Sequence, residues 1–237
     1  MSARLAELER KITACERCPE LRAYCAEVAR TKKREYREQR YWGRPVPAFG
    51  DPAARIVLVG LAPGAHGSNR TGRMFTGDAS GVWLYRALYR AGFANQPVQA
   101  GRDDGMLLRD VLITAALRCA PPANKPTPGQ LRNCFPYLEA ELAALPGLRV
   151  VVGLGAIGGR AAARALLEAG YRFERKSAFA HGVVAAAARA ASPRRVALLY
   201  SYHPSRQNTN TGVLTEPMFD AIFERAKSLL RAAEFSD

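Results

Sequence analysis

Four short apolar segments divide the chain at intervals typical of buried parallel strands. They are the runs at residues 55–60, 111–115, 149–153 and 195–200. Each run is rich in Val, Ile and Leu and does not alternate apolar with polar residues, as expected where helices cover both faces of a sheet. The pattern therefore predicts four strands at the centre of the molecule.

Amphipathic segments lie between and after these runs and predict helices. One begins near Asp78 or Ser80 and stops at Gly92, a residue suited to the position after a helix C-terminus. Others are predicted at about residues 128–145, 156–169 and 215–233, and the Ala-rich stretch 183–194 is predicted to be a hairpin or loop. The alternation predicts an α/β fold, a three-layer αβα sandwich with a central, mostly parallel four-stranded sheet.

Unusual residues gather in the segments that follow the four predicted strands. These segments are GLAPGAHGSNRTGRMFTGD (60–78), RCAPPANKP (118–126), GLG (153–155) and YHPSRQNT (202–209). In an open parallel sheet the carboxyl ends of the strands meet at one edge, and ligands bind there. We therefore expect the four loops to form one pocket.

Composition narrows the class of protein. The 237 residues are 48% hydrophobic and 24% charged, which is ordinary for a globular protein and too apolar for a disordered one. No run reaches the roughly 18 apolar residues of a membrane span, and the N-terminal MSARLAELERKIT resembles a charged helix rather than a secretion signal. We expect one domain over residues 1–237, with residues 1–50 as a basic helical extension, in the cytoplasm and at the nucleoid.

The net charge points to a polyanionic partner. The chain has 35 Lys and Arg against 21 Asp and Glu, a formal charge of +14. Residues 30–44, called the basic segment below, contain seven of the cations: Arg30, Lys32, Lys33, Arg34, Arg37, Arg40 and Arg44. Such an excess favours nucleic acid, because cationic side chains release the counterions of phosphates. The alternative is a solvated helix face.

Five cysteines, an odd number, indicate a reducing compartment rather than a disulfide framework. Cys15 and Cys18 have the spacing of a metal knuckle, and Cys119 and Cys134 form a wider pair. Four thiolates suit either zinc or a [4Fe–4S] cluster, and the spacing alone does not choose between them. Cys25 is predicted to be a small buried hydrophobe. The alternative is that all five are core thiols.

The sequence GLGAIG at 153–158 has the G-x-G-x-x-G pattern of dinucleotide-binding loops. That fingerprint requires an acidic residue at the end of the next strand, about 20 residues on. Glu168 lies within the predicted helix and Glu174 in a basic loop. We therefore expect these glycines to serve close helix–strand packing.

Four motifs in order carry a resemblance to a known family. GLAPG (60–64), GRMFTGD (72–78), RCAPPANKPTP (118–128) and YHPSRQNT (202–209) resemble the motif set of the uracil-DNA glycosylase superfamily, and within it the family 5, or type B, enzymes. Cys15, Cys18, Cys119 and Cys134 resemble that family's [4Fe–4S] ligands. The resemblance extends from Cys15 to Thr215.

The resemblance implies a monofunctional DNA glycosylase that acts as a monomer. Such an enzyme flips deaminated bases out of DNA, uracil and also hypoxanthine and xanthine, and hydrolyses the N-glycosidic bond to start base excision repair. It also implies a structural [4Fe–4S] cluster, because this hydrolysis needs no electron. The motif residues are those of a uracil-DNA glycosylase-like fold.

The resemblance assigns the chemistry to three residues. Asp78 positions or deprotonates the attacking water and favours positive charge on the sugar, with an N-cap of the following helix as the alternative role. His203 donates a hydrogen bond to the departing base. Asn124 touches the base or the water, with a turn-forming role as the alternative.

Substrate contacts are implied for a second group. Phe75 stacks on the flipped base, or alternatively staples the following helix. Gly64 and Ala65 offer backbone N–H groups to the base, and Arg206, Gln207 and Asn208 lie against the DNA strand. No role is assigned to His66, and His181 is predicted to be structural.

Ala62 precedes Pro63, where many superfamily members carry an acidic or amide side chain that handles the water. Type B enzymes share this feature. It leaves the handling of the water to Asp78 and suggests that the enzyme accepts a broader range of deaminated bases. Two alternatives remain: a type A (family 4) uracil-specific glycosylase, and a non-catalytic Fe–S or zinc module that binds nucleic acid.

Overall fold

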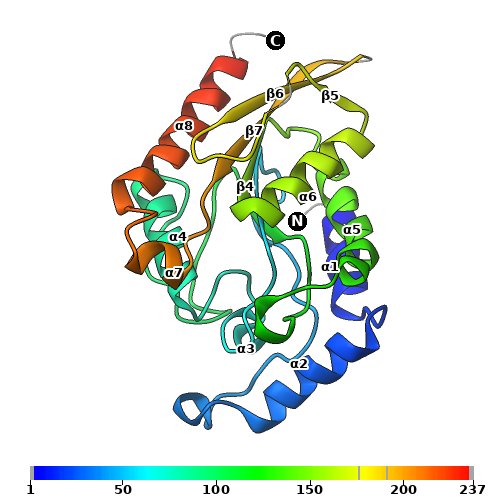
Figure 1. Ribbon diagram of the computed structural model, residues 1–237, viewed down its shortest axis with the longest axis vertical. Coiled ribbons are helices and arrows are strands. Elements are labelled where there is room, and N and C mark those ends of the chain that lie inside the picture. The colour runs from blue at the N-terminus through cyan, green and yellow to red at the C-terminus, as the bar shows by residue number, and fades with distance from the viewer. Residues whose placement is uncertain (1–2, 176, 191, 235–237) are drawn as a thin grey trace.

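The structure is a computed structural model that describes residues 3–175, 177–190 and 192–234 (Figure 1). Its strands are β1 (Phe49–Gly50), β2 (Ile56–Gly60), β3 (Val111–Ala115), β4 (Val150–Leu154), β5 (Tyr171–Phe173), β6 (Val184–Arg189) and β7 (Ser192–Ser201). Its helices are α1 (Ala3–Thr13), α2 (Pro19–Thr31), α3 (Ser68–Thr71), α4 (Ala79–Arg90), α5 (Pro128–Ala143), α6 (Gly155–Glu168), α7 (Arg206–Asn210) and α8 (Glu216–Glu234). Two short 3₁₀ turns are η1 (Arg34–Tyr36) and η2 (Pro122–Asn124).

The predicted strands form the parallel part of the sheet. The strand order is β1-β3-β2-β4-β7-β6-β5, in which β3, β2, β4 and β7 run parallel. Side chains of these strands alternate between two cores: Ile56 and Leu58 face one, and Val57 and Val59 face the other. Because both faces are buried, the sequence reads as an unbroken apolar run.

Helices cover both faces of the sheet, as predicted. Helices α4 and α8 pack together on one face, and α5 and α6 pack on the other, where α1 joins α5 (Figure 1). The carboxyl ends of the parallel strands point toward α3, α7 and the loop that contains η2 (Figure 1). The α/β three-layer fold is confirmed.

The predicted number of four strands is too low. The sheet of the described residues also contains β1, β5 and β6, which pair antiparallel with their neighbours. Strands β1 and β5 have only two and three residues, too few for a periodic signal. Strand β6 is VAAAAR, and alanine carries little strand propensity. Together β6 and β7 form the hairpin that the 183–194 stretch predicts.

Glycine packing explains the G-x-G-x-x-G pattern. A Cβ on Gly153 would lie 2.4 Å from the Gly159 Cα, and one on Gly158 would lie 2.3 Å from the Val59 carbonyl oxygen. Helix α6 therefore approaches β4 and β2 more closely than any side chain allows, as expected for a packing role.

The N-terminal segment is helical and basic, as predicted. Helix α2 extends past the carboxyl edge of the sheet, and the basic segment follows it at the end of the molecule (Figure 1). Across the three described ranges, no helix has both the length and the apolar character needed to cross a bilayer.

Candidate active site

Asp78 caps α4 and also borders the first loop. Its Oδ1 accepts a hydrogen bond from the Gly81 N–H at 3.0 Å, so the capping role is confirmed. Its Oδ2 lies against Gly64 and Gly67, where an added Cβ would come within 3.2 and 2.3 Å of it. One carboxylate oxygen therefore holds the helix, while the other lies against the GLAPG loop.

Phe75, from the loop after β2, and His203, from the loop after β7, lie side by side. Their rings stack with centroids 5.8 Å apart and planes 28° from parallel. Phe75 is buried and packs over the end of β2, where a Cβ on Gly60 would lie 2.8 Å from the ring. Its φ of 52° is an uncommon conformation for an aromatic residue and is typical of strain held at a functional site.

The backbone around His203 is fixed from several sides. The Asn208 side-chain amide donates to the His203 carbonyl oxygen at 2.9 Å. Gly155, with φ of 79°, lies so close that an added Cβ would be 3.1 Å from the His203 Cβ. His181 accepts a hydrogen bond from the Tyr202 N–H at 3.2 Å, which agrees with its predicted structural role.

Gly64 and Ala65 present hydrogen-bond donors. Within the described ranges, their backbone N–H groups have no protein acceptor. The Gly64 carbonyl oxygen accepts from the Gly67 and Asn69 N–H groups at 3.2 and 3.0 Å, which fixes the orientation of the loop. Two neighbouring N–H groups without a protein acceptor suit a ligand oxygen that gains negative charge.

Burial shifts the pKa values of both ionisable groups of the site, Asp78 and His203. Burial raises the pKa of Asp78 above its ordinary 3.8, against the lowering effect of the Gly81 and Ser80 N–H groups and of nearby arginines. Burial lowers the pKa of His203 to about 4. The imidazole is therefore neutral at physiological pH and can donate one N–H.

The three predicted DNA contacts differ in their surroundings. Arg206 and Gln207 are exposed on α7, and the Arg206 charge is felt by Lys33 of the basic segment. The Asn208 amide is instead engaged with the His203 carbonyl. This contact makes Asn208 a support for His203, a role that sequence reasoning missed.

Asn124 lies in an exposed turn. It ends η2 with φ of 56°, next to Ala123 with φ of 52°. Asparagine tolerates this left-handed conformation well, which fits the turn-forming alternative. Its catalytic role stays a prediction.

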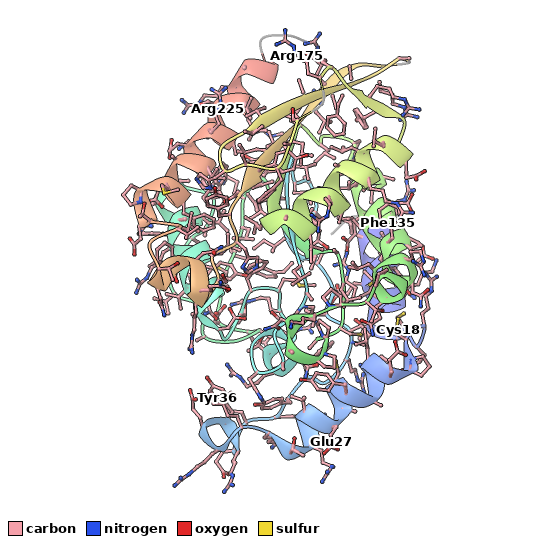
Figure 2. All side chains as sticks on the ribbon, in the orientation of Figure 1. Cys18, Glu27, Tyr36, Phe135, Arg175 and Arg225 are labelled. Carbon is pink, nitrogen blue, oxygen red and sulfur yellow. The ribbon has the colours of Figure 1, made fainter. Side chains whose placement is uncertain are left out.

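The four predicted metal ligands line one small cavity. Cys15 and Cys18, from the segment between α1 and α2, meet Cys119 and Cys134 there, and Cys18 is labelled in Figure 2. The Arg118 N–H donates to the Cys134 Sγ at 3.2 Å, as second-sphere donors do at metal thiolates. Cys25 lies outside this cavity lining and is fully buried, as predicted, with its Sγ 3.6 Å from the Ala120 carbonyl oxygen.

The four cysteines that line the cavity are a donor set that fits the four thiolate ligands of a [4Fe–4S] cluster. Within the described ranges, no three His, Cys, Asp or Glu side chains lie close enough together to hold one metal ion. Two buried arginine atoms whose residues line the cavity, Arg22 Nε and Arg118 Nη1, have no hydrogen-bond acceptor among the described residues, although Arg22 Nε lies 3.6 Å from the Glu16 Oε1. A cluster with four thiolates is anionic and rich in sulfur acceptors, so it would satisfy both.

Comparison with known proteins decides the family. The family described as "Uracil DNA glycosylase superfamily" matches residues 47–227, which is more than two thirds of the chain. The chain belongs to this superfamily. The match covers all the pocket loops, whereas Cys15 and Cys18 precede it.

Individual relatives within the superfamily are similar over most of their length. The type-5 uracil-DNA glycosylase of Thermus thermophilus is 53% identical over 220 residues, covering 92% of this chain and 94% of the relative. The type-5 enzyme of Mycobacterium bovis is 46% identical over 226 residues, covering 95% and 81%. The type-4 enzyme of Pyrobaculum aerophilum is 29% identical over 227 residues, covering 93% and 90%. The resemblance to type 5 is therefore confirmed.

Sequence reasoning missed a buried arginine in the first loop of this superfamily member. Arg70 lies in α3 with 8% of its surface exposed and donates hydrogen bonds to the His66 and Gly77 carbonyl oxygens. His66, beside it, pairs its Nδ1 with the Tyr41 hydroxyl at 3.0 Å. A charged residue inside a Gly-rich loop was the only signal, and such residues are usually solvent-exposed.

Proposed function

We propose that the protein is a type-5-like DNA glycosylase that removes deaminated bases from DNA to start base excision repair. As a member of its superfamily it is an N-glycosidic bond hydrolase. The observation that carries the proposal is the convergence at one sheet edge of the Asp78 carboxylate, the Phe75–His203 pair and the Gly64 and Ala65 N–H groups. These groups match the charges that develop when this bond breaks.

Asp78 acts on the sugar side. As the bond between C1′ and the base nitrogen breaks, its electron pair leaves with the base and positive charge builds on the sugar. The carboxylate stabilises that charge and orients water, whose oxygen bonds to C1′ and whose proton leaves through Asp78. Because Oδ1 is held by the Gly81 N–H, the orientation of the carboxylate is set before substrate binds.

His203 and the loop N–H groups act on the base side. The departing base carries negative charge on its carbonyl oxygens. A neutral imidazole N–H and the backbone N–H groups of Gly64 and Ala65 stabilise that charge without losing a proton of their own.

Phe75 supplies the stacking surface. Stacked bases lie about 3.4 Å apart, so a base sandwiched between two rings needs roughly 7 Å. The Phe75 and His203 centroids are 5.8 Å apart. The base therefore cannot be sandwiched between the two rings, and we assign the stacking contact to Phe75 and the hydrogen bond to His203.

DNA binding follows from charge. The +14 excess supplies affinity for phosphates that does not depend on sequence and offsets the few kcal/mol needed to unstack a base. Arg206 and Gln207 are exposed on α7, and the Arg206 charge interacts with that of Lys33 in the basic segment. We assign them to the DNA strand on either side of the flipped nucleotide.

A panel of lesions tests the function and its breadth. Single- and double-stranded oligonucleotides containing uracil, hypoxanthine or xanthine are incubated with the protein, and alkali then cleaves at abasic sites. We expect cleavage at uracil and at the two purines, because Ala62 places no polar side chain at the water-handling position. Cleavage at uracil alone indicates the type-4 specificity, and no cleavage at any lesion indicates a binding module.

The rate of excision is expected to fall in acid. Burial raises the pKa of Asp78 above 3.8, so its carboxylate is lost at a higher pH than that of an exposed aspartate. Activity should therefore be level at neutral and alkaline pH and should decline as pH falls through the raised pKa. Single-turnover rates from about pH 4 to about pH 9 measure this decline, which is called the acid limb of the pH–rate profile below. A rate that rises with acidification would contradict a carboxylate mechanism.

The structural cluster is part of the same proposal. Cys15, Cys18, Cys119 and Cys134 would hold a [4Fe–4S] cluster, whose role is to bind two distant parts of the chain together. Ala62 of GLAPG and Ala65, which directly follows it, pack against the apolar residues around these cysteines. Loss of the cluster would therefore loosen the loop that faces the base.

We expect the anaerobically purified protein to be brown with about four iron atoms per chain. The Cys119→Ser variant should lose colour and iron, and its melting temperature should fall. Cys25→Ala is the matched control and should retain the colour and the iron, because the Cys25 thiol interacts with the Cys119 thiol but does not line the cavity. A colourless native protein with stoichiometric zinc would reverse the assignment.

A further inference from the structure

Arg70 joins two parts of its own loop, at His66 and Gly77, to the distant residues Tyr36 and Gln39. Its Nε donates to the His66 carbonyl oxygen at 2.7 Å and its Nη2 to the Gly77 carbonyl oxygen at 3.0 Å. Its Nη1 donates to the Gln39 side chain, and its guanidinium lies 3.9 Å from the centre of the Tyr36 ring. Tyr36 and Gln39 belong to the basic segment, and Figure 2 shows Tyr36 where that segment meets the body of the molecule.

The charge of Arg70 is buried beside neutral partners. Only 8% of its surface is exposed, and within the described ranges it has no Asp or Glu at ion-pair distance. Glu35, which feels its charge, is paired with Lys33 at 2.7 Å. A buried cation without a carboxylate partner is costly, so such residues are seldom retained for packing alone.

Gly77 is shaped to accept this contact. Its φ is 89°, and an added Cβ would lie 2.4 Å from the Arg70 Nη2. The carbonyl group that accepts from Arg70 therefore belongs to a position where only glycine fits. The next residue in the chain is Asp78, so the hydrogen bond sets the backbone from which the carboxylate extends.

We propose that Arg70 is a positioning residue for Asp78, which ties the carboxylate's backbone to the GLAPG loop and to the basic segment. Through His66 and Gly77 it fixes the start and the end of the first loop relative to each other. Through Tyr36 and Gln39 it connects them to the segment that faces DNA. This inference rests on the proposed function of Asp78.

The charges around Asp78 give the expected sign of a pH effect. Arg70 from α3 and Arg206 from α7 lower its pKa, whereas burial raises it. Tyr85 from α4 interacts with the carboxylate, and the neutral His203 ring lies at the same sheet edge. Removal of the Arg70 charge should therefore raise the pKa of Asp78 and move the acid limb of activity to higher pH.

The test compares Arg70→Met and Arg70→Lys with the control Arg164→Met. Arg164 is half-exposed on α6 and packs on Phe135, away from the pocket loops. Single-turnover uracil release is measured across pH with saturating enzyme, and affinity is measured with an oligonucleotide containing 2′-fluoro-deoxyuridine, which resists cleavage. Melting temperatures report on folding.

We expect Arg70→Met to lower the rate at neutral pH roughly 10²-fold, the scale of a misplaced catalytic group, with a smaller loss of affinity. Its acid limb should move to higher pH. Arg70→Lys keeps the charge but not the planar fork, so its limb should stay in place and its rate should recover only in part. Arg164→Met should match the wild type in rate and limb.

Two results would overturn the proposal. One is an Arg70→Met rate and acid limb equal to those of the wild type; the other is an Arg70→Lys protein no faster than Arg70→Met with the same fall in melting temperature. If Arg70→Met does not fold, a wild-type rate for Arg70→Lys overturns it. An inactive wild-type protein, or a fully active Asp78→Asn variant, refutes the proposed function instead.

Discussion

Replacement of Asp78 by asparagine should lower the single-turnover rate of uracil release roughly 10²- to 10⁴-fold, the usual effect of losing a positioned acid–base group. Asparagine is an equally good helix cap, so its side-chain oxygen can keep the hydrogen bond from the Gly81 N–H. What disappears is the negative charge beside the GLAPG loop. The rate should therefore fall while the melting temperature and the affinity for DNA stay close to those of the wild type.

The Asp220→Asn variant is the matched control. Asp220 is partly exposed on α8 and forms an ion pair with Arg90 at 2.8 Å, away from the pocket loops. This substitution makes the same chemical change and should leave the rate of uracil release unaltered. If Asp78→Asn also keeps the wild-type rate with an intact fold, Asp78 is a helix cap and nothing more.

Replacement of His203 by alanine should lower the same rate roughly 10²- to 10³-fold, as the loss of one oxyanion donor does. The neutral imidazole stabilises the departing base, and the Gly64 and Ala65 N–H groups remain to supply part of that effect. The Asn208 amide still holds the backbone at position 203. The local fold should therefore survive.

A change of leaving group separates this role from a structural one. Fluorine at position 5 of uracil withdraws electrons, so 5-fluorouracil departs with less need of a hydrogen-bond donor. His203→Ala should lose less activity on 5-fluorouracil than on uracil. Equal losses on the two bases would show that His203 does not act on the leaving group.

The layered architecture was predictable because a strand that is buried on both faces has an unbroken run of apolar residues. The runs at 55–60, 111–115, 149–153 and 195–200 are apolar throughout, and every one belongs to the parallel sheet. The convergence of their loops followed from topology alone. By contrast, β1 and β5 are too short to show a period, and β6 is made largely of alanine.

Side-chain partners within the loops were not predictable in the same way. Asn208 was expected to contact DNA, yet its amide donates to the His203 carbonyl. The buried pair of Arg118 with Glu141, which also accepts from the Thr114 hydroxyl at 2.6 Å, joins residues of a loop, a helix and a strand. Buried arginines follow no sequence period, since each depends on acceptors supplied by distant segments.

The most direct test of the central claim is the crystal structure of the protein bound to DNA that contains 2′-fluoro-deoxyuridine. The account predicts a flipped uracil stacked on Phe75, with a carbonyl oxygen within hydrogen-bond distance of His203 or of the Gly64 and Ala65 N–H groups. The Asp78 Oδ2 should face C1′ across one water. A flipped base seated elsewhere, or C1′ out of reach of Asp78, would contradict it.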